Sequence, residues 1–320
     1  MSRNQIRMRR GRPIPKISLF GLLVAIFAAR TKAQQLLIKG EYGMMAGTTP
    51  PPGLYAGMWG SIDWGTELKT GGGDTVHGPK LTQESFGPLV MWVSNLKILG
   101  GDYSAVVAAP WANTRIEFPR LGQGGSSGLG FSQLWIIPFS LGWHIHDPLP
   151  LAPGGADVTV HYAFYPPTGR YTPGASDNTS LGMWCNEMSA RLTAFFDKDR
   201  NWHGSASLFY DINSKKEGLD WTTGNPFTFM GGLGRSYGAK NSLFSGWAGI
   251  AGYGQWQVTS TTGADAPELA RLNKTTIYGV GPEFTTLQGA LTIRYFWQYG
   301  GKFSTQGQGL YVQFVMPLNF

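Results

Sequence analysis

The last twelve residues, GLYVQFVMPLNF, alternate between apolar and more polar side chains. A period of two indicates a β-strand whose two faces meet different surroundings. A strand that ends on an aromatic residue, with no polar tail, is typical of a transmembrane barrel, where one face contacts lipid and the other a wet lumen. A strand of a soluble sheet, packed on a core, is the alternative. On one face of the expected strand lie the apolar residues Phe320, Leu318, Met316, Phe314, Val312 and Leu310, and on the other face Asn319, Pro317, Val315, Gln313 and Tyr311.

The N-terminal part has the layout of a secretory signal peptide. The first 33 residues contain eight Lys or Arg residues and no acidic residue. The apolar run ISLFGLLVAIFAA (17–29) is too short to cross a bilayer as a helix, which needs about 20 residues. Small residues at Thr31 and Ala33 predict cleavage after Ala33, although basic residues are unusual so close to a cleavage site. We therefore expect residues 1–33 to be a cleaved signal peptide, with an N-terminal membrane anchor as the alternative.

Removal of this segment changes what the charge implies. The full chain has 26 Lys and Arg against 19 Asp and Glu, a net charge of +7. Without the eight basic residues of the signal, 18 remain against 19, a net charge of −1. No basic patch is left to bind nucleic acid. The one cysteine, Cys185, excludes an internal disulfide, and the 46 Gly, 12 Trp and 13 Tyr suit bending strands and the aromatic girdles of a barrel.

Alternating segments separated by turn signals continue along the chain. In ALTIRYFWQY (290–299), Arg294 falls opposite the apolar set, as expected where a charge at the lipid midplane costs roughly 2–4 kcal/mol. In FSQLWIIPFSLGWHI, the alternation places every second residue from Phe131 to Ile145 on one face. The sequence thus predicts an all-β fold, a transmembrane antiparallel up-and-down β-barrel of 12 strands, with 10 or 14 as alternatives. The expected strands are 53–68, 81–95, 102–118, 130–145, 158–168, 183–197, 202–214, 227–238, 244–260, 275–287, 290–303 and 309–320.

The connections between these strands tend to alternate in length. A soluble sandwich gives no reason for this segregation, whereas outer-membrane barrels have short periplasmic turns and longer outer loops. With both chain ends in the periplasm, the long set faces outward. Two connections are exceptions, 146–157 being longer and 304–308 shorter than expected. The long connections are 69–80, 119–129, 169–182, 215–226 and 261–274, and the short ones are 96–101, 198–201, 239–243 and 288–289.

The segment TTLQGAL (285–291) fixes the register of one hairpin. If Gln288 and Gly289 form a two-residue turn, Glu283 lies directly opposite Arg294. The alternation places both on the lumen side, and directly opposed residues have Cβ atoms about 5 Å apart. We therefore predict an ion pair inside the barrel, with two separately hydrated charges as the alternative.

Residues 34–53, QQLLIKGEYGMMAGTTPPPG, are predicted not to form a strand. The triple proline lacks N–H donors and favours an extended polyproline conformation. We expect this segment to lie in or under the periplasmic mouth and to narrow it, while residues 54–320 form the barrel. The residues assigned to this plug are Tyr42, Met44, Met45, Pro50, Pro51 and Pro52.

Polar and aromatic side chains on the expected inner faces are candidates for lining the lumen. Three of them are histidines, for which a zinc or copper site is a less favoured alternative to ordinary polar lining. No metal and no cofactor are expected. The candidates are Asp63, His144, His146, His161, Glu187, Arg191, Phe209, Asp211, Glu283, Arg294 and Phe296.

Four motifs occur in an order that resembles a known family. They are GEYGMMAGTTPPPGLYAG (40–57), MWVSNLKILGGDYSAVVAAP (91–110), FSQLWIIPFSLGWHI (131–145) and YPPTGRYTPG (165–174). They look like the outer-membrane proteins grouped as the putative MetA-pathway of phenol degradation family, over nearly all of the chain after the signal. The resemblance implies a monomeric barrel in the outer membrane of a Gram-negative bacterium that lets small hydrophobic or aromatic compounds pass. It supplies neither a substrate nor a catalytic residue.

The expected function is therefore passive uptake of such compounds, and the chain is not expected to be an enzyme. The expected partners are outer-membrane lipid, the solutes, and the barrel-assembly machinery, which would bind the C-terminal strand ending at Phe320. Two alternatives remain. A structural barrel with a closed lumen would not conduct ions, and a lipid-modifying barrel enzyme would hydrolyse phospholipid.

Overall fold

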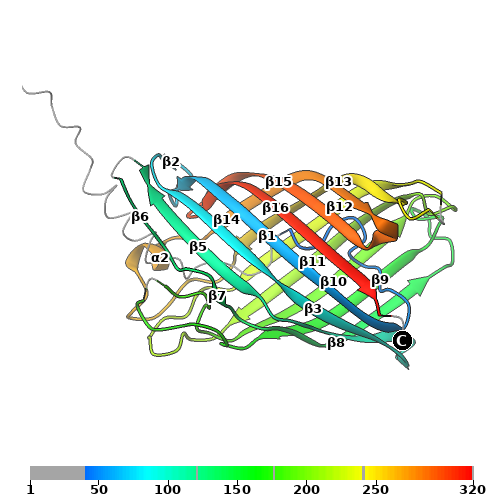
Figure 1. Cartoon of the computed structure of the whole chain (residues 1–320), viewed down its shortest axis with the longest axis horizontal. Helices are drawn as coiled ribbons and strands as arrows, with labels where there is room; N and C mark the ends of the chain where they lie inside the picture. The colour runs from blue at the N-terminus through cyan, green and yellow to red at the C-terminus, as the bar shows by residue number, and fades with distance from the viewer. Residues whose placement is uncertain (1–39, 120–121, 176, 240–241, 319–320) are drawn as a thin grey trace, which may run out of the picture.

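The computed structural model describes residues 40–119, 122–175, 177–239 and 242–318, and there it shows a closed antiparallel β-barrel (Figure 1). The sheet closes because the first strand pairs with both the last strand and the third. The predicted signal peptide (1–33) and Phe320 lie outside the described residues. The strands are β1 (Gly53–Lys69), β2 (Thr75–Val76), β3 (Lys80–Ile98), β4 (Gly101–Ala108), β5 (Trp111–Phe118), β6 (Gln123–Ser126), β7 (Gly130–Phe131), β8 (Trp135–Ile145), β9 (Ala156–Tyr165), β10 (Cys185–Phe195), β11 (Trp202–Asn213), β12 (Pro226–Tyr237), β13 (Gly246–Gln257), β14 (Thr276–Thr286), β15 (Leu291–Lys302) and β16 (Thr305–Pro317).

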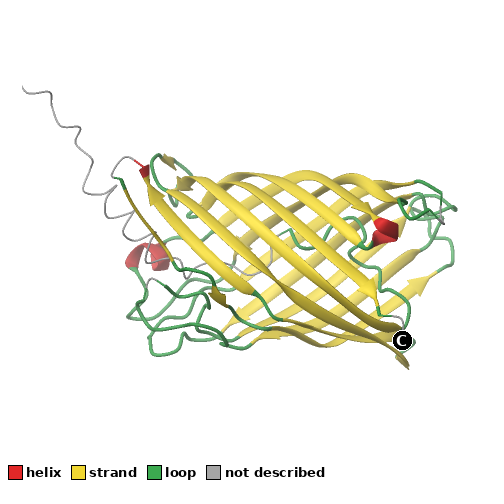
Figure 2. Cartoon of the chain, viewed as in Figure 1, coloured by secondary structure: helices red, strands yellow, loops and turns green. Residues whose placement is uncertain are grey.

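The predicted fold class and strand number are confirmed. Twelve strands close the barrel, with β4 and β5 together occupying one strand position and β2, β6 and β7 as short additions. Strands dominate the described chain, and the helical pieces, α2 (Glu268–Leu272) and η3 (Leu287–Gly289), lie at the two ends (Figure 2). None of the described helices is long and apolar enough to cross a membrane.

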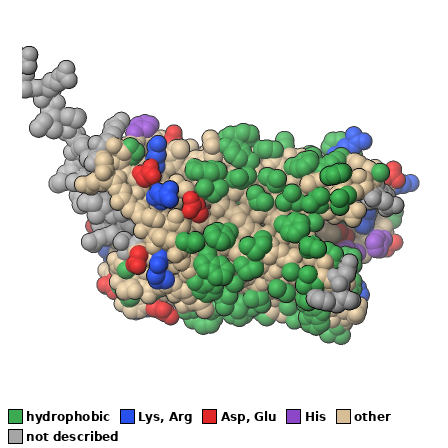
Figure 3. All heavy atoms as spheres, viewed as in Figure 1, with side chains coloured by type: hydrophobic (Ala, Val, Ile, Leu, Met, Phe, Trp, Pro, Cys, Tyr) green, Lys and Arg blue, Asp and Glu red, His purple; other side chains and the backbone are tan. Residues whose placement is uncertain are grey.

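The two faces of the wall differ as a bilayer requires. On β10, Met188 and Leu192 point outward with 49% and 40% of their surface exposed, whereas Glu187 and Thr193 are fully buried in the interior. On the face shown in Figure 3, hydrophobic side chains cover a broad central region, and charged side chains gather towards the two ends. This arrangement puts apolar surface against lipid and keeps charges away from the midplane.

The predicted strand 102–118 is interrupted. It separates into β4 and β5 at Ala109 and Pro110, and only β4 pairs with β8. Proline has no N–H to donate to a ladder, which favours a break at this point. Beyond the break, β5 pairs with β6 and β7, so the sequence between Phe118 and β8 folds back onto the wall.

The prediction that residues 131–145 present one continuous face is wrong. The pairing of β8 with β9 shifts between Ile136 and Phe139, so a bulge reverses the alternation. Phe139 is 41% exposed on the outside, whereas Trp135 and Gln133 line an internal cavity. Pro138 lies inside the bulge and cannot donate a ladder hydrogen bond.

The predicted register of the β14–β15 hairpin is confirmed. Glu283 pairs with Arg294, and the Ala290 N–H donates to the Leu287 carbonyl oxygen across 3.1 Å, which closes a two-residue turn. Gln288 and Gly289 have φ of 55° and 95°, as a type I′ turn requires. The local turn chemistry therefore sets which residues meet across this part of the lumen.

The longer connections lie at the end of the barrel that is opposite the C-terminus, together with β2, β6 and α2 (Figure 1). We call this the outer end and the other the periplasmic end, following the predicted orientation.

In the outer connection 214–225, Lys216 is 2% exposed and its Nζ donates to the Leu181 carbonyl oxygen across 2.8 Å. It also lies 5.1 Å from the ring of Trp221. Burial lowers the pKa of Lys216 from 10.5 to about 8, because the charged ammonium loses water.

Lys216 should make the stability of the protein depend on pH between about 8 and 10.5. In this window the unfolded chain binds more protons, so the free energy of unfolding rises with pH, by up to about 1.4 kcal/mol per pH unit. The variant Lys216→Met keeps the apolar stem and removes the titration. We expect the difference in unfolding free energy between the two proteins, measured with urea in detergent, to change across this window. A difference that is constant from pH 7 to 11 would contradict the assignment.

Candidate functional site

Residues 40–52, which we call the N-terminal strap, run through the interior of the barrel without forming a strand. The strap is held by the wall on several sides. The Met44 N–H donates to Glu283 Oε2 on β14 across 3.0 Å, and the Gly47 N–H donates to Thr193 Oγ1 on β10 across 2.9 Å. Nearer the periplasmic end, Thr48 Oγ1 donates to Asp157 Oδ2 on β9 across 2.8 Å. Backbone groups that have no ladder partner are thus satisfied by inward side chains.

Glycines in the wall make room for the side chain of Met44. A Cβ atom added at Gly234 would lie 2.0 Å from the Met44 sulfur, and one at Gly232 would lie 2.8 Å from Met44 Cγ. A Cβ at Gly249 would lie 2.5 Å from the same sulfur. We call Gly232, Gly234 and Gly249 the glycine socket. Met44 is fully buried there, so the strap docks by shape as well as by hydrogen bonds.

The variant Gly234→Ala should displace Met44 and loosen the strap, because its Cβ would overlap the sulfur. We expect higher single-channel conductance in planar bilayers. Adding Met44→Ala should restore room and bring the conductance back towards the native value. Gly60→Ala is the matched control, since the nearest atom to a Cβ there, beyond the two neighbouring residues in the chain, is Phe86 Cβ at 3.5 Å. Equal conductance in Gly234→Ala and the native protein would argue against the socket.

Tyr42 covers an aromatic and polar part of the inner wall. Its ring stacks on Phe209 with 5.2 Å between centroids, and the guanidinium carbon of Arg191 lies 4.6 Å from its centroid. Phe209 is 2% exposed. Tyr42 therefore contacts the neighbouring strands β10 and β11 through a cation–π contact and ring stacking.

A buried polar cluster lies beside Tyr42. His161 Nε2 and Glu187 Oε1 are 2.7 Å apart, and the Tyr165 hydroxyl donates to Glu187 Oε2 across 3.0 Å. Asp211 is directly opposite Glu187 in the β10–β11 ladder. Glu187 is fully buried and Asp211 is 2% exposed, so two carboxylates sit side by side away from water.

The Glu283–Arg294 pair supports the strap from the other side. Arg294 Nε lies 3.1 Å from Glu283 Oε2, and both residues are at most 8% exposed. Arg294 Nη1 also donates to the carbonyl oxygen of Glu41 across 2.8 Å. The ion pair thus holds two backbone groups of the strap, which satisfies charges that would be costly alone.

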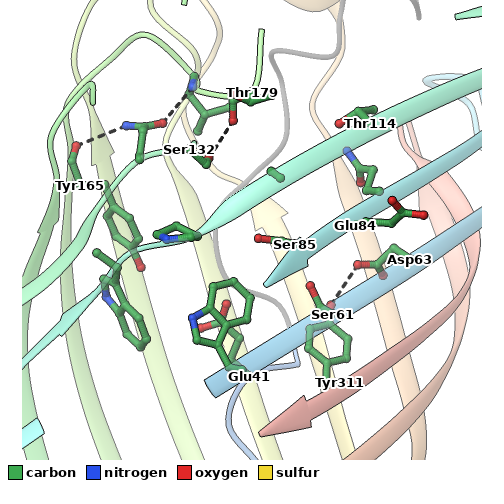
Figure 4. A pocket seen from close by; sticks show the side chains of 17 residues that line it. Glu41, Ser61, Asp63, Glu84, Ser85, Thr114, Ser132, Tyr165, Thr179 and Tyr311 are labelled. Atoms are coloured by element: carbon green, nitrogen blue, oxygen red, sulfur yellow. Dashed lines mark hydrogen bonds between the residues drawn. The ribbon is translucent and has the colours of Figure 1, made fainter. Parts of the chain in front are cut away.

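A cavity of about 150 Å³ lies between the strap and the wall towards the outer end (Figure 4). Four aromatic residues line it, namely Trp59, Trp135, Tyr165 and Tyr311. Polar side chains from β1, β3, β5 and the loops before β8 and β10 also line it. The indole N–H groups of Trp59 and Trp135 have no hydrogen-bond partner among the described residues. The cavity therefore combines aromatic faces with polar side chains.

A second cavity of about 60 Å³ adjoins the first along the strap. Glu41, Trp59, Trp135 and Tyr311 line both cavities. The smaller one also reaches Arg294. Together the two cavities leave room for a small solute beside the strap, next to Trp59, Trp135 and Tyr311.

Of the three predicted histidines, His161 lies apart from His144 and His146. His144 Nδ1 lies 2.9 Å from Asp157 Oδ1, and its ring stacks with that of His146 at 6.5 Å. His146 is exposed at the periplasmic end, whereas His161 belongs to the buried cluster. Among the described residues, no three His, Cys, Asp or Glu side chains are arranged to hold a metal ion.

The remaining predicted residues are distributed between the interior and the periplasmic mouth. Asp63 is 9% exposed and accepts a hydrogen bond from Gln298 across 2.8 Å, and Phe296 is fully buried. Pro51 and Pro52 are exposed at the mouth, whereas Pro50 and Met45 are half-buried.

Sequence reasoning missed the cavity residues. The alternation places Trp135 on the same face as Phe139, because the bulge in β8 leaves no signal in the sequence. Trp59 and Tyr311 fall on the inner parity of β1 and β16, so alternation alone indicates their direction. Glu41 belongs to a segment without periodicity, and no pattern in the sequence indicates where it points.

Comparison with known proteins gives a family and a fold. A family model described as "Putative MetA-pathway of phenol degradation" matches residues 66–314. No curated protein sequence matches the chain. The crystal structure of the COG4313 outer membrane channel from Pseudomonas putida F1 superposes with a TM-score of 0.64 at 13% identity, covering 88% of this chain and 100% of that one. At this identity the likeness concerns the fold.

Two further solved structures are more distant. The transport unit of the autotransporter AIDA-I from Escherichia coli has a TM-score of 0.47 at 10% identity and covers 93% of this chain and 98% of its own. The CymD monoaromatic hydrocarbon channel has a TM-score of 0.32 at 8% identity, covering 95% and 94%. Because the family model spans more than half of the sequence, the chain belongs to the putative MetA-pathway of phenol degradation family, and its barrel is of the outer-membrane type.

Proposed function

We propose that this protein is an outer-membrane channel for the passive uptake of small hydrophobic or aromatic compounds. The observation that carries the proposal is the cavity beside the strap, which Trp59, Trp135, Tyr165 and Tyr311 line together with polar side chains. Such a wall replaces water around an aromatic ring while it still binds a hydroxyl or carbonyl oxygen. Membership of a family described by a pathway of phenol degradation supports an aromatic solute, and the fold shared with the COG4313 outer membrane channel supports a channel.

The strap explains why such a channel would favour small apolar solutes. It fills the centre of the interior through Met44 and Tyr42, so a wide aqueous pore is not left open. A hydrated sugar or ion would have to shed water to pass beside these side chains, whereas an aromatic ring loses little. We propose no catalytic step.

A structural barrel with a closed lumen is the second candidate. It is favoured by the same occupancy of the interior by the strap, which is hydrogen-bonded to β9, β10 and β14. The two candidates differ in one measurable property, the protein-dependent passage of solutes.

Uptake into intact Gram-negative cells distinguishes these candidates. Radiolabelled phenol, an aromatic acid, an alkane and a sugar of similar size are compared in cells with the protein and in cells with an empty vector. We expect a protein-dependent increase for at least one aromatic or apolar solute that exceeds the increase for the sugar, and that persists when the proton-motive force is collapsed. If no such solute passes faster than the sugar, the proposed function fails. If nothing passes at all, the closed barrel is supported.

A further inference from the structure

A row of aromatic rings crosses the lipid-facing side of β12–β15 towards the outer end. It consists of Phe227, Trp256, Tyr278 and Tyr299, whose neighbouring ring centroids are 6.0, 5.6 and 5.6 Å apart in that order. The Trp256 indole N–H donates to the Tyr278 hydroxyl across 3.0 Å. Trp and Tyr rings gather at the boundary between the apolar core of a bilayer and its headgroups, so this row marks the outer boundary.

A second group of rings lies towards the periplasmic end. The Tyr237 ring stacks on Phe284 with 5.4 Å between centroids. Strand β12 runs from Phe227 in the first row to Tyr237, ten residues later. With a rise of about 3.4 Å per residue and a strand tilt of about 40°, this spacing is about 25 Å along the barrel axis, which is the height of the apolar band of such a barrel. Tyr237 therefore marks the periplasmic boundary.

Arg235 is an exposed cation just inside this boundary. It alternates on β12 with Leu233 and Tyr237, so it shares their lipid-facing side. In the β11–β12 ladder it lies directly opposite Trp202, and its guanidinium carbon is 5.6 Å from the centroid of that ring. Its partner on the other side, in β13, is the small Ala248. From this position the long side chain can carry its charge into the headgroup layer.

The charge of Arg235 has no acidic partner in the protein. The ion pairs among the described residues do not include it. Asp197 lies in the turn before Trp202, and its carboxylate accepts hydrogen bonds from the backbone N–H groups of Asn201 and Trp202, each across 2.8 Å. The contact that Arg235 makes with a side chain is the one with the Trp202 ring, which leaves its N–H donors to bind a group outside the chain.

We propose that Arg235 and Trp202 bind the phosphate of an anionic phospholipid in the leaflet on the periplasmic side. A guanidinium presents parallel N–H donors that match two phosphate oxygens. The acyl chains would lie along Leu233 and Ile250, which are directly opposed in the β12–β13 ladder and are 53% and 60% exposed. A zwitterionic headgroup fits less well, because its ammonium would approach the guanidinium. The site is on the outside of the wall, so it does not depend on the passage of solutes.

Native mass spectrometry of the delipidated protein in detergent counts bound lipids directly. Dioleoylphosphatidylglycerol and dioleoylphosphatidylcholine share acyl chains and a phosphate but differ in headgroup charge. We expect the dissociation constant of the first bound phosphatidylglycerol to be about fivefold lower than that of phosphatidylcholine. Arg235→Gln should remove this preference. Arg271→Gln removes the same charge from α2 at the outer end, and as the matched control it should keep the preference.

Two further measurements keep the test specific. The soluble sn-glycerol 3-phosphate has the phosphate without the chains, and at equal concentration it should not displace phosphatidylglycerol. Arg235→Lys keeps the charge but loses the paired donors, so its preference should lie between those of the native protein and Arg235→Gln. Heat-modifiable migration on gels confirms that each variant is folded.

Equal dissociation constants for the two lipids in the native protein would overturn the proposal. A preference that survives in folded Arg235→Gln would overturn it as well, because the phosphate would then be bound elsewhere. Effective competition by sn-glycerol 3-phosphate would refute a lipid site, since the acyl chains would not contribute to binding.

Discussion

Deletion of residues 34–50 is expected to raise the single-channel conductance several-fold. The strap contributes Tyr42 and the fully buried Met44 to the centre of the interior, and its removal leaves that volume to water. The deletion also removes the hydrogen bonds that Glu283 and Asp157 accept from strap residues. These two carboxylates can then interact with permeating cations. A rise in conductance with a greater preference for cations is the result that the structure predicts. Planar-bilayer recordings in potassium chloride measure both quantities.

A change in barrel assembly would complicate this comparison, so the deletion needs a control. Heat-modifiable migration on gels reports whether the barrel is folded, and the Gly234→Ala protein provides a second route to a loosened strap. If a folded deletion protein conducts no more than the native one, the strap does not limit passage.

Neutralising one member of the Glu283–Arg294 pair is expected to destabilise the protein by about 3–5 kcal/mol, because the other charge is left buried without its partner. Glu283→Gln also replaces the carboxylate that accepts a hydrogen bond from the Met44 N–H. Arg294→Gln removes the guanidinium that donates a hydrogen bond to the Glu41 carbonyl oxygen. The double variant should be less destabilised than the sum of the two single variants. Urea unfolding in detergent gives the three free energies.

An exposed pair supplies the matched comparison. Lys215 and Asp220 are 2.8 Å apart, with side chains that are 59% and 53% exposed. Solvent screening makes such pairs worth about 0–1 kcal/mol, so the same cycle there should give little coupling. Purely additive losses at Glu283 and Arg294 would mean that the buried pair does not act as a unit.

The sequence predicts most of the wall because a barrel strand is a local, repetitive pattern. Alternation on β10 and β15 separates Glu187 and Arg294 from the lipid-facing residues, and the Gln288–Gly289 turn sets the register that brings Glu283 to Arg294. Both signals depend on residues near one another in the chain, so neighbouring strands can be paired without knowing the rest of the fold.

Strand alternation and turn residues do not indicate local irregularities of a strand or the path of the strap. The bulge at Ile137 and Pro138 reverses the direction of Trp135 without changing the apolar character of the segment. The glycines at 232, 234 and 249 indicate a bending strand from sequence alone, whereas their actual role is to receive Met44, a contact between distant parts of the chain. Such contacts depend on three-dimensional complementarity between a non-periodic segment and a wall.

Blocking the larger cavity tests most directly whether solutes pass beside the strap. Ser61 lines this cavity, and the thiol of Ser61→Cys would take a benzylthio group from benzyl methanethiosulfonate, forming a mixed disulfide and releasing methanesulfinate. Cys185 is fully buried, and the native protein treated with the same reagent controls for it, as does Ser242→Cys in a periplasmic turn. After complete labelling, verified by mass spectrometry, uptake of the aromatic solute should fall to the empty-vector level and recover on reduction. Undiminished uptake by the fully labelled protein would contradict passage through this cavity.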